Sequence, residues 1–208
     1  MNAPPGEFSE RFQESVGRPF LCSTRLSLVS NFKIGGPADY YFCAASLKEL
    51  EDAVLCAQRE KVRYYIIGGG YNVLFDDMGY RGLIIKNEAK SLRMSEDDTV
   101  KAASGTGLDD FLEFCVKHGI EGYEFLAGIP GSIGGAVFGN AGAFGESIGD
   151  FLEQAVLLSG NQGQVEVTGE SLGFGYRHSR LKIRHDLLIN ARFSVKYGDR
   201  ALIKERIR

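Results

Sequence analysis

Two glycine-rich segments and one arginine-containing cluster hold the residue types that bind anions in this 208-residue sequence. The first segment, GGGYNVL at 68–74, follows a short aromatic and β-branched run that is typical of a strand. Consecutive residues without a Cβ atom let backbone N–H groups point into one concavity, which can hold a diphosphate. Neither the Walker loop nor the G-x-G-x-x-G fingerprint fits these residues. A plain tight turn is the alternative interpretation.

The second segment, AGIPGSIGGAVFGNAGAFG at 127–145, is more specific. Pro130 fixes φ just before Gly131, which predicts a short helix whose free N–H groups face an anion. Small residues at 139 and 141–143 would let a large flat group lie against the backbone. Together the two segments predict a ligand with a diphosphate and a planar ring system. A densely packed glycine corner is the alternative.

The third cluster is Phe174-Gly175-Tyr176-Arg177-His178-Ser179-Arg180. Arg177 offers a planar, permanently charged fork for a carboxylate or phosphate, and Tyr176 can donate one hydrogen bond. A solvated arginine is the commoner outcome for such a cluster. We interpret His178, and also His118 and His185, as structural rather than as general bases. The paired acids at 76–77, 97–98 and 109–110 are interpreted as turn and helix-start residues.

Composition excludes several classes of protein. Hydrophobic residues make up 44% and charged residues 25%, which is typical of a globular chain rather than of a disordered, collagen-like or coiled-coil one. The net charge is −3, but residues 177–208 carry ten basic and three acidic side chains. This basic segment is interpreted as a solvated surface or, alternatively, as a wall that faces an anion. Nucleic-acid binding is disfavoured because no recognition motif is present.

Location and metal content follow from patterns that the sequence lacks. No apolar run approaches the roughly 20 residues of a membrane helix, and residues 1–12 lack the pattern of a secretory signal. The four cysteines are scattered without a close pair or a histidine cluster. We therefore expect reduced thiols in a cytosolic protein, with neither a disulfide framework nor a metal site.

The expected elements form an α+β pattern. A loosely structured arm over 1–24 contains one helical stretch near 7–16. A capping box at Ser46 and Glu49 predicts a helix to about residue 61, and Thr106 and Gly119 bound a second helix over 108–118. Strands are expected at 64–67 (buried), 82–86, 99–103 and 187–196, with a hairpin over 154–168. Asp199 caps a final helix over 199–208.

Four segments, taken in order, identify a family resemblance. SNFKIGGPAD at 30–39, GGGYNVL at 68–74, EFLAGIPGSIGGAVFGNAGAFG at 124–145 and GYRHS at 175–179 resemble the UDP-N-acetylenolpyruvoylglucosamine reductase family over roughly residues 25–198. The resemblance implies the two-lobed, vanillyl-alcohol-oxidase-like (PCMH-type) FAD-binding fold. The lobes are expected at 25–87 and 88–198, with the flavin held between them.

The resemblance also implies which residues meet the cofactor and the substrate. In the first segment the FAD contacts are expected at Gly68, Gly69, Gly70, Tyr71, Asn72 and Val73. In the second they are expected at Gly128, Gly131, Ser132, Gly134, Gly135, Asn140, Ala141 and Gly142. Tyr176 and Arg177 match the family positions beside the enolpyruvyl group of the substrate.

The family reaction implies a role for the arginine. NADPH passes hydride to FAD, reduced FAD passes it to the enol ether carbon of a UDP-sugar, and negative charge spreads onto the neighbouring carboxylate. A fixed guanidinium at Arg177 would stabilise that charge.

In the family, a third domain follows and supplies the proton-donating serine, a glutamate and much of the uridine-diphosphate pocket. We therefore expect either part of a longer enzyme of peptidoglycan precursor synthesis, with the proton donor on a missing domain or a partner chain, or a shortened relative. The alternative function is a non-catalytic FAD- or nucleotide-binding module. A flavin oxidase for another small substrate is a more distant possibility.

Overall fold

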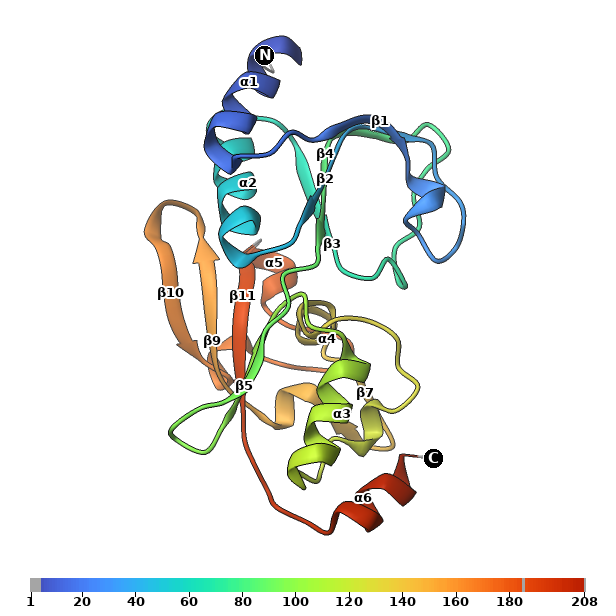
Figure 1. The fold of residues 1–208 in the computed structure, drawn as a ribbon, viewed down its shortest axis with the longest axis vertical. Coiled ribbons are helices and arrows are strands. Elements are labelled where there is room, and N and C mark those ends of the chain that lie inside the picture. Colours follow the sequence, from blue (N-terminus) through green and yellow to red (C-terminus); the bar gives the residue numbers. More distant parts are fainter. Residues whose placement is uncertain (1–4, 185, 208) are drawn as a thin grey trace. The chain divides into compact units, whose positions relative to one another are not determined.

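The computed structural model describes residues 5–184 and 186–207 of the chain, which divides into two compact units, 1–89 and 90–208. Residues 1–4 of the expected arm, His185 and Arg208 lie outside the described residues. Each unit combines helices with a β-sheet, so the α+β class is confirmed (Figure 1). The division falls two residues after the expected lobe boundary.

Unit 1 is built on a four-stranded sheet in the order β1-β2-β4-β3. Its strands are β1 (Leu21–Arg25), β2 (Pro37–Ala44), β3 (Tyr64–Ile67) and β4 (Tyr80–Asn87). Strands β2 and β3 run parallel to β4, whereas β1 is antiparallel to β2. The expected strand at 64–67 is present, but it lies at an edge of the sheet and exposes Tyr65 instead of being buried.

Two helices, α1 (Pro5–Val16) and α2 (Leu47–Arg59), belong to unit 1. The expected cap of α2 is confirmed, because the Glu49 N–H donates to the Ser46 hydroxyl at 3.2 Å. The helical stretch expected near residues 7–16 is present as α1, but the arm that contains it is packed rather than loose. Its Phe8 and Phe12 lie one helical turn apart and are fully buried, and Phe12 packs edge-on against Phe42 of β2 at 5.1 Å between ring centroids. Strand β1, also within the expected arm, pairs with β2.

Residues 26–36 and 68–79 form two loops that are joined by hydrogen bonds. A small core of Leu26, Phe75, Tyr41, Ile67 and Ile84 connects these loops to the sheet. The Gly36 N–H donates to the Asp76 carbonyl at 2.9 Å. The loop that follows β3 is therefore held in place by the loop that precedes β2.

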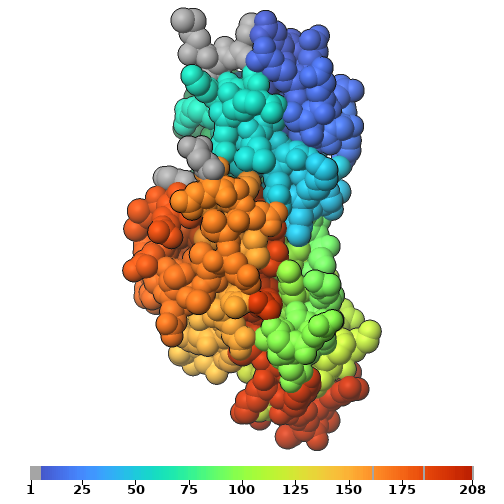
Figure 2. All heavy atoms as spheres, turned by 90° about the vertical axis from the view of Figure 1, so that its left-hand side faces the viewer, coloured from blue at the N-terminus to red at the C-terminus, as the bar shows by residue number. Residues whose placement is uncertain are grey.

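Unit 2 contains a five-stranded antiparallel sheet in the order β10-β9-β11-β6-β5. The strands are β5 (Leu92–Met94), β6 (Val100–Ala103), β9 (Leu152–Ser159), β10 (Gly163–Thr168) and β11 (Leu187–Phe193). Strands β9 and β10 form the expected hairpin and lie at the surface of this unit (orange in Figure 2). A separate two-stranded ribbon joins β7 (Gly142–Ala143) to β8 (Glu146–Ser147).

The helices of unit 2 are α3 (Leu108–His118), α4 (Ile133–Gly139), α5 (Leu181–Arg184) and α6 (Arg200–Arg206). Phe111 of α3 and Val137 of α4 share one core with Ala102, Ala155 and Phe193 of the sheet, so α3 and α4 cover the same face. The second helix has its predicted bounds, and Gly119 ends it with φ of 68°. Gly107, not Thr106, is its N-cap, because the Thr106 hydroxyl donates to the Ser91 carbonyl instead. Asp199 caps α6 as expected.

Candidate functional site

The loop after β3 has the properties expected of an anion-binding nest. Two of its carbonyl oxygens are occupied, because the Asn31 N–H donates to the Gly70 oxygen at 2.9 Å and the Ser30 hydroxyl donates to the Val73 oxygen at 3.0 Å. In contrast, the backbone N–H groups of residues 69–73 donate no hydrogen bond to another described residue. A fixed loop with unused N–H donors can bind a phosphate.

Two of the glycines in this loop are required by close packing. Gly70 has φ of +73°, and a Cβ atom there would lie 2.4 Å from the Val29 carbonyl oxygen. A Cβ at Gly69 would meet the ring of Tyr71 at 2.5 Å. Asn72, next to these residues, is exposed. The loop therefore has little freedom to close over its own N–H groups.

The N-terminus of α4 differs from its prediction. The helix begins at Ile133 after the N-cap Ser132, and its first N–H groups are used within the protein. Ile133 donates to the Thr106 carbonyl at 2.8 Å, and Gly134 donates to the Ser104 carbonyl at 2.7 Å. The Gly135 N–H faces the Ser132 hydroxyl at 3.4 Å. The expected set of free donors at this helix start is therefore wrong, because the 104–107 segment and the Ser132 cap accept them.

The glycines of the second segment fall into two groups. At Gly134 and Gly142 a Cβ atom would meet a backbone oxygen at 2.9 and 2.3 Å, so these positions are tightly packed. At Gly128 and Gly139 a Cβ would meet nothing within 4 Å, and at Gly135 only the Ser132 hydroxyl at 3.7 Å. Close packing therefore does not explain the second group. Gly135, Phe138 and Gly139 share the open side of α4, opposite the buried Ala136 and Val137.

Asn140 ties the end of α4 to the arginine-containing turn. It closes the helix with φ of 46°, a conformation that asparagine tolerates. Its side-chain amide donates to the Gly175 carbonyl at 2.9 Å and accepts the Gly149 N–H at 3.0 Å. The Ser179 hydroxyl donates to the Phe138 carbonyl at 2.8 Å. Unit 2 thus brings two separate predicted motifs together, the glycine segment and the GYRHS turn.

Tyr176 and Arg177 lie at the exposed tip of this turn. Gly175 and His178 close it with two backbone hydrogen bonds of 3.0 and 3.1 Å. Arg177 has φ of 52°, an uncommon value for a residue other than glycine and one that often marks functional positions. Its guanidinium carbon lies 5.7 Å from the centre of the Tyr176 ring. The Lys182 ammonium donates to the Arg177 carbonyl at 2.7 Å, so the backbone is anchored and the guanidinium remains exposed.

The buried thiols are poor nucleophiles at neutral pH. Burial raises the pKa of Cys115 to about 12 and that of Cys43 to about 11, which keeps both protonated. All four cysteines are free. Among the described residues, no group of three or more His, Cys, Asp or Glu side chains could hold a metal ion. Over the same residues, no helix has the length and apolar character to span a membrane.

Sequence reasoning missed several residues that position the site. Ser30 and Asn31 were recognised as part of a motif, but not as the residues that hold the 68–73 loop. Ser104 and Thr106 accept the first α4 donors, and Phe144 is 95% exposed at the tip of the β7–β8 turn with φ of 56°. The SGTG run at 104–107 was a sequence signal for Ser104 and Thr106. A phenylalanine between small residues gave no signal of a left-handed turn.

Comparison with known proteins agrees with this geometry. The family model described as an FAD binding domain matches residues 38–169, which contain both glycine segments. The chain belongs to the FAD binding domain family. This FAD-binding-domain chain is 36% identical over 191 residues to a UDP-N-acetylenolpyruvoylglucosamine reductase of Caldicellulosiruptor bescii, covering 92% of this chain and 61% of that protein.

Solved structures place the FAD-binding-domain chain in the same fold group. The crystal structure of UDP-N-acetylenolpyruvylglucosamine reductase from Thermus caldophilus matches with a TM-score of 0.75 at 26% identity, covering 88% of this chain and 65% of that one. The Physcomitrella patens BBE-like 1 protein matches with a TM-score of 0.68 at 16% identity, covering 91% of this chain and 44% of that one, which supports the fold alone. The family resemblance and the fold class are confirmed. The chain spans 61% to 66% of the length of the first curated relatives.

Proposed function

We propose that this chain binds FAD and takes part in the reduction of UDP-N-acetylenolpyruvoylglucosamine to UDP-N-acetylmuramate. The observation that carries the FAD assignment is the loop at 69–73, whose N–H groups are unused while the carbonyls of Gly70 and Val73 hold it to residues 30–31. These donors suit the two negatively charged phosphates of the cofactor. The FAD-binding-domain membership supports the same assignment.

The remaining FAD contacts are assigned to the open side of the second glycine segment. We assign Gly128, Gly131, Gly135 and Gly139 to direct approach of the cofactor, because a Cβ atom at these positions meets no backbone atom within 4 Å. Ser132, Gly134, Asn140, Ala141 and Gly142 shape the segment, since their donors or their Cβ positions are already in contact with the protein. This division refines the set of cofactor residues that the sequence suggested.

Arg177 and Tyr176 are the residues we assign to the substrate. When bound, FAD supplies hydride transfer from NADPH to the enol ether carbon of the substrate. The exposed Arg177 guanidinium would bind the enolpyruvyl carboxylate and stabilise the negative charge that grows there. Tyr176 would donate a hydrogen bond beside it. The hydrogen bonds of the turn anchor the backbone from which both side chains extend.

The proposed reaction implies a wider context for this chain. Reduction of a UDP-sugar to UDP-N-acetylmuramate is a step of peptidoglycan precursor synthesis, and hence of cell wall biogenesis, cell shape and the cell cycle, in the cytoplasm. The proton donor for the second carbon is assigned to a further domain or a partner chain. Among the described residues near Arg177, His178 is half-buried in the turn and its N–H and carbonyl close that turn.

The test is an assay of NADPH oxidation by the FAD-loaded chain. With UDP-N-acetylenolpyruvoylglucosamine, the flavin should be reduced by NADPH and reoxidised by the substrate. Addition of a separately expressed C-terminal domain from a relative should raise the rate about a hundredfold or more if that domain supplies the general acid.

The controls separate three functions. A yellow protein whose flavin is not reoxidised by the substrate, with or without the added domain, would contradict the reductase proposal and leave a flavin-binding module. Faster reoxidation by oxygen than by the substrate would point to an oxidase. A protein that cannot be loaded with FAD would contradict the whole proposal.

A further inference from the structure

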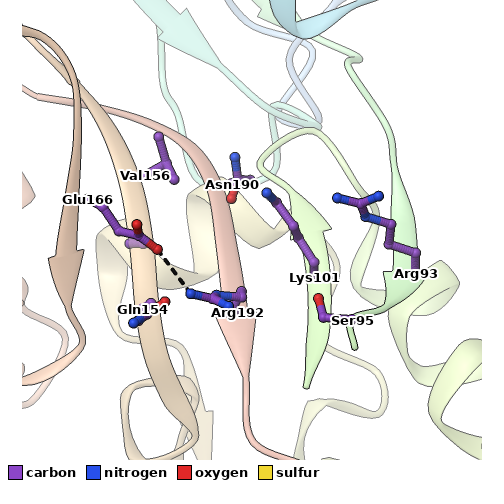
Figure 3. A pocket seen from close by; sticks show the side chains of 9 residues that line it. Arg93, Ser95, Lys101, Gln154, Val156, Glu166, Asn190 and Arg192 are labelled. Atoms are coloured by element: carbon purple, nitrogen blue, oxygen red, sulfur yellow. Dashed lines mark hydrogen bonds and ion pairs between the residues drawn. The ribbon is translucent and has the colours of Figure 1, made fainter. Parts of the chain in front are cut away.

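A pocket lies on the face of the five-stranded sheet opposite α3 and α4. Its volume is about 220 Å³, and Figure 3 shows its side chains in place. Residues from all five strands line it, and most of them are polar or charged. The full lining is Arg93, Ser95, Lys101, Gln154, Ala155, Val156, Glu166, Asn190 and Arg192. The pocket belongs wholly to unit 2 and lies on the other face of the sheet from the glycine segment and the GYRHS turn.

Three cations lie side by side across neighbouring strands of this face. Arg93 of β5 is directly opposite Lys101 of β6, and Lys101 is directly opposite Arg192 of β11. Like charges directly opposite each other on paired strands destabilise a sheet. Two such pairs in one row concentrate positive charge on this face of the sheet.

The acidic groups in this region are bound to one of the three cations. Arg192 forms ion pairs with Asp97 and, at 3.0 Å, with Glu166. Over residues 5–184 and 186–207, neither Arg93 nor Lys101 has a hydrogen bond or ion pair with an acidic side chain. In Figure 3 their side chains extend toward the same end of the pocket, where Asn190 lies. This end therefore presents two uncompensated positive charges.

A buried acceptor in the same pocket also lacks a partner. The Gln154 Oε1 atom is buried and accepts no hydrogen bond within the described part of the chain. This atom has almost no accessible surface, so a ligand in the pocket does not reach it. The Asn190 side-chain amide also has no hydrogen bond among the described residues, and it lies at the end of the pocket toward which Arg93 and Lys101 extend. The pocket thus offers cations for an anion and, at Asn190, an amide for a hydroxyl group.

We propose that this pocket binds a small phosphomonoester that also carries hydroxyl groups, such as a sugar phosphate. Arg93 and Lys101 bind the phosphate through charge-assisted hydrogen bonds. A ligand hydroxyl forms a hydrogen bond with the Asn190 side-chain amide. The site is separate from the proposed flavin site, and its occupancy does not depend on FAD or NADPH.

The experiment is isothermal titration calorimetry on the full chain at pH 8 and constant ionic strength, with glucose 6-phosphate, inorganic phosphate and glucose as probes. Saturable one-site binding of glucose 6-phosphate is expected, at least tenfold tighter than that of inorganic phosphate, with none for glucose. Arg93→Gln and Lys101→Gln should each weaken it at least tenfold. Lys117→Gln, which removes an exposed charge from α3, should leave it within twofold.

Folding is checked by the melting temperature without ligand. Arg93→Gln relieves repulsion from Lys101, so it should not lower that temperature. Non-saturable binding, or equal weakening by Lys117→Gln, would overturn the proposal, because the anion would then be a diffuse counter-ion. Equal affinities for inorganic phosphate and glucose 6-phosphate would overturn the assignment to a phosphomonoester.

Discussion

Arg177 combines features that rarely occur together in an exposed residue. Its φ of 52° is uncommon for a side chain of its size, and its carbonyl is held by Lys182 at 2.7 Å. The turn around it is fastened to α4 through Asn140 and Ser179. A solvated arginine, the alternative that the sequence left open, needs none of these contacts.

Replacement of this side chain should separate chemistry from cofactor binding. Arg177→Ala should leave the FAD dissociation constant unchanged while lowering the rate of flavin reoxidation by the substrate about a hundredfold, because one charge-stabilising donor is lost. Stopped-flow absorbance of the reduced flavin measures this rate. Arg184→Ala on α5 removes the same charge from an exposed helix and should have no effect. Loss of flavin from Arg177→Ala would show that the residue is misplaced in our proposal.

At the residue level, the sequence identified which segments form the motifs, but it was less successful in assigning a role to each residue within them. Gly70 was predicted as a backbone donor. Its positive φ and the nearby Val29 carbonyl explain why this position has no side chain. Asn140 was predicted as a cofactor ligand, but both ends of its amide are bonded to the protein. Such contacts join residues up to 35 positions apart, and local patterns do not encode them.

Helix α4 lies where the sequence predicted a helix, but its role differs from the predicted one. The seven residues form a helix as the motif suggested, but Ser132 caps it and the 104–107 segment accepts its first donors. Its contribution is therefore an open side, where Gly135 and Gly139 flank the partly exposed Phe138, rather than an N-terminal charge. Ile133 and Val137 pack into the core, and this packing holds the open side of the helix in a fixed position.

Neighbouring glycines of α4 give a matched test of this interpretation. Gly134→Ala should destabilise the chain by about 1–3 kcal/mol, because its Cβ would crowd the Ser104 carbonyl at 2.9 Å. Gly135→Val should keep the melting temperature, since its Cβ position is open and valine is a better helix former than glycine. The same Gly135→Val change should weaken FAD binding at least tenfold. Thermal unfolding and FAD titration of both variants measure this contrast.

The interpretation fails if Gly135→Val binds FAD normally, because the open side of α4 would then face no cofactor. It also fails if Gly134→Ala folds normally and loses FAD, because the tight glycine would then be the one in contact.

Elements with a strong local signal were predicted well. The helix over 108–118 and the hairpin of β9 and β10 combine clear periodicity with a glycine at the turn or cap. Strands β1 and β2 were missed, and residues 5–24 were expected to be loose apart from the helical stretch near 7–16. Those residues are fixed by aromatic contacts from Phe12 to Phe20 and Phe42, which depend on tertiary packing.

At the scale of the whole molecule, the chain is two α+β units that each carry one glycine segment. Membership of the FAD binding domain family explains why both segments occur in one chain. The same order of motifs is what allowed the fold class to be predicted from the sequence. The pocket of unit 2 was not predicted, because its cations come from three strands whose register a sequence does not show.

Unused backbone N–H groups at 69–73 should make the diphosphate the main source of affinity for FAD. Each charge-assisted hydrogen bond contributes about 1.5–3 kcal/mol, so two of them correspond to roughly a hundredfold or more in affinity. The most direct measurement is the dissociation constant of the unmodified chain for FAD and for riboflavin, which has the same ring system but lacks the diphosphate and the adenosine. We predict that FAD binds at least a hundredfold more tightly. Equal binding of the two, or no binding of FAD, would contradict the assignment of this loop.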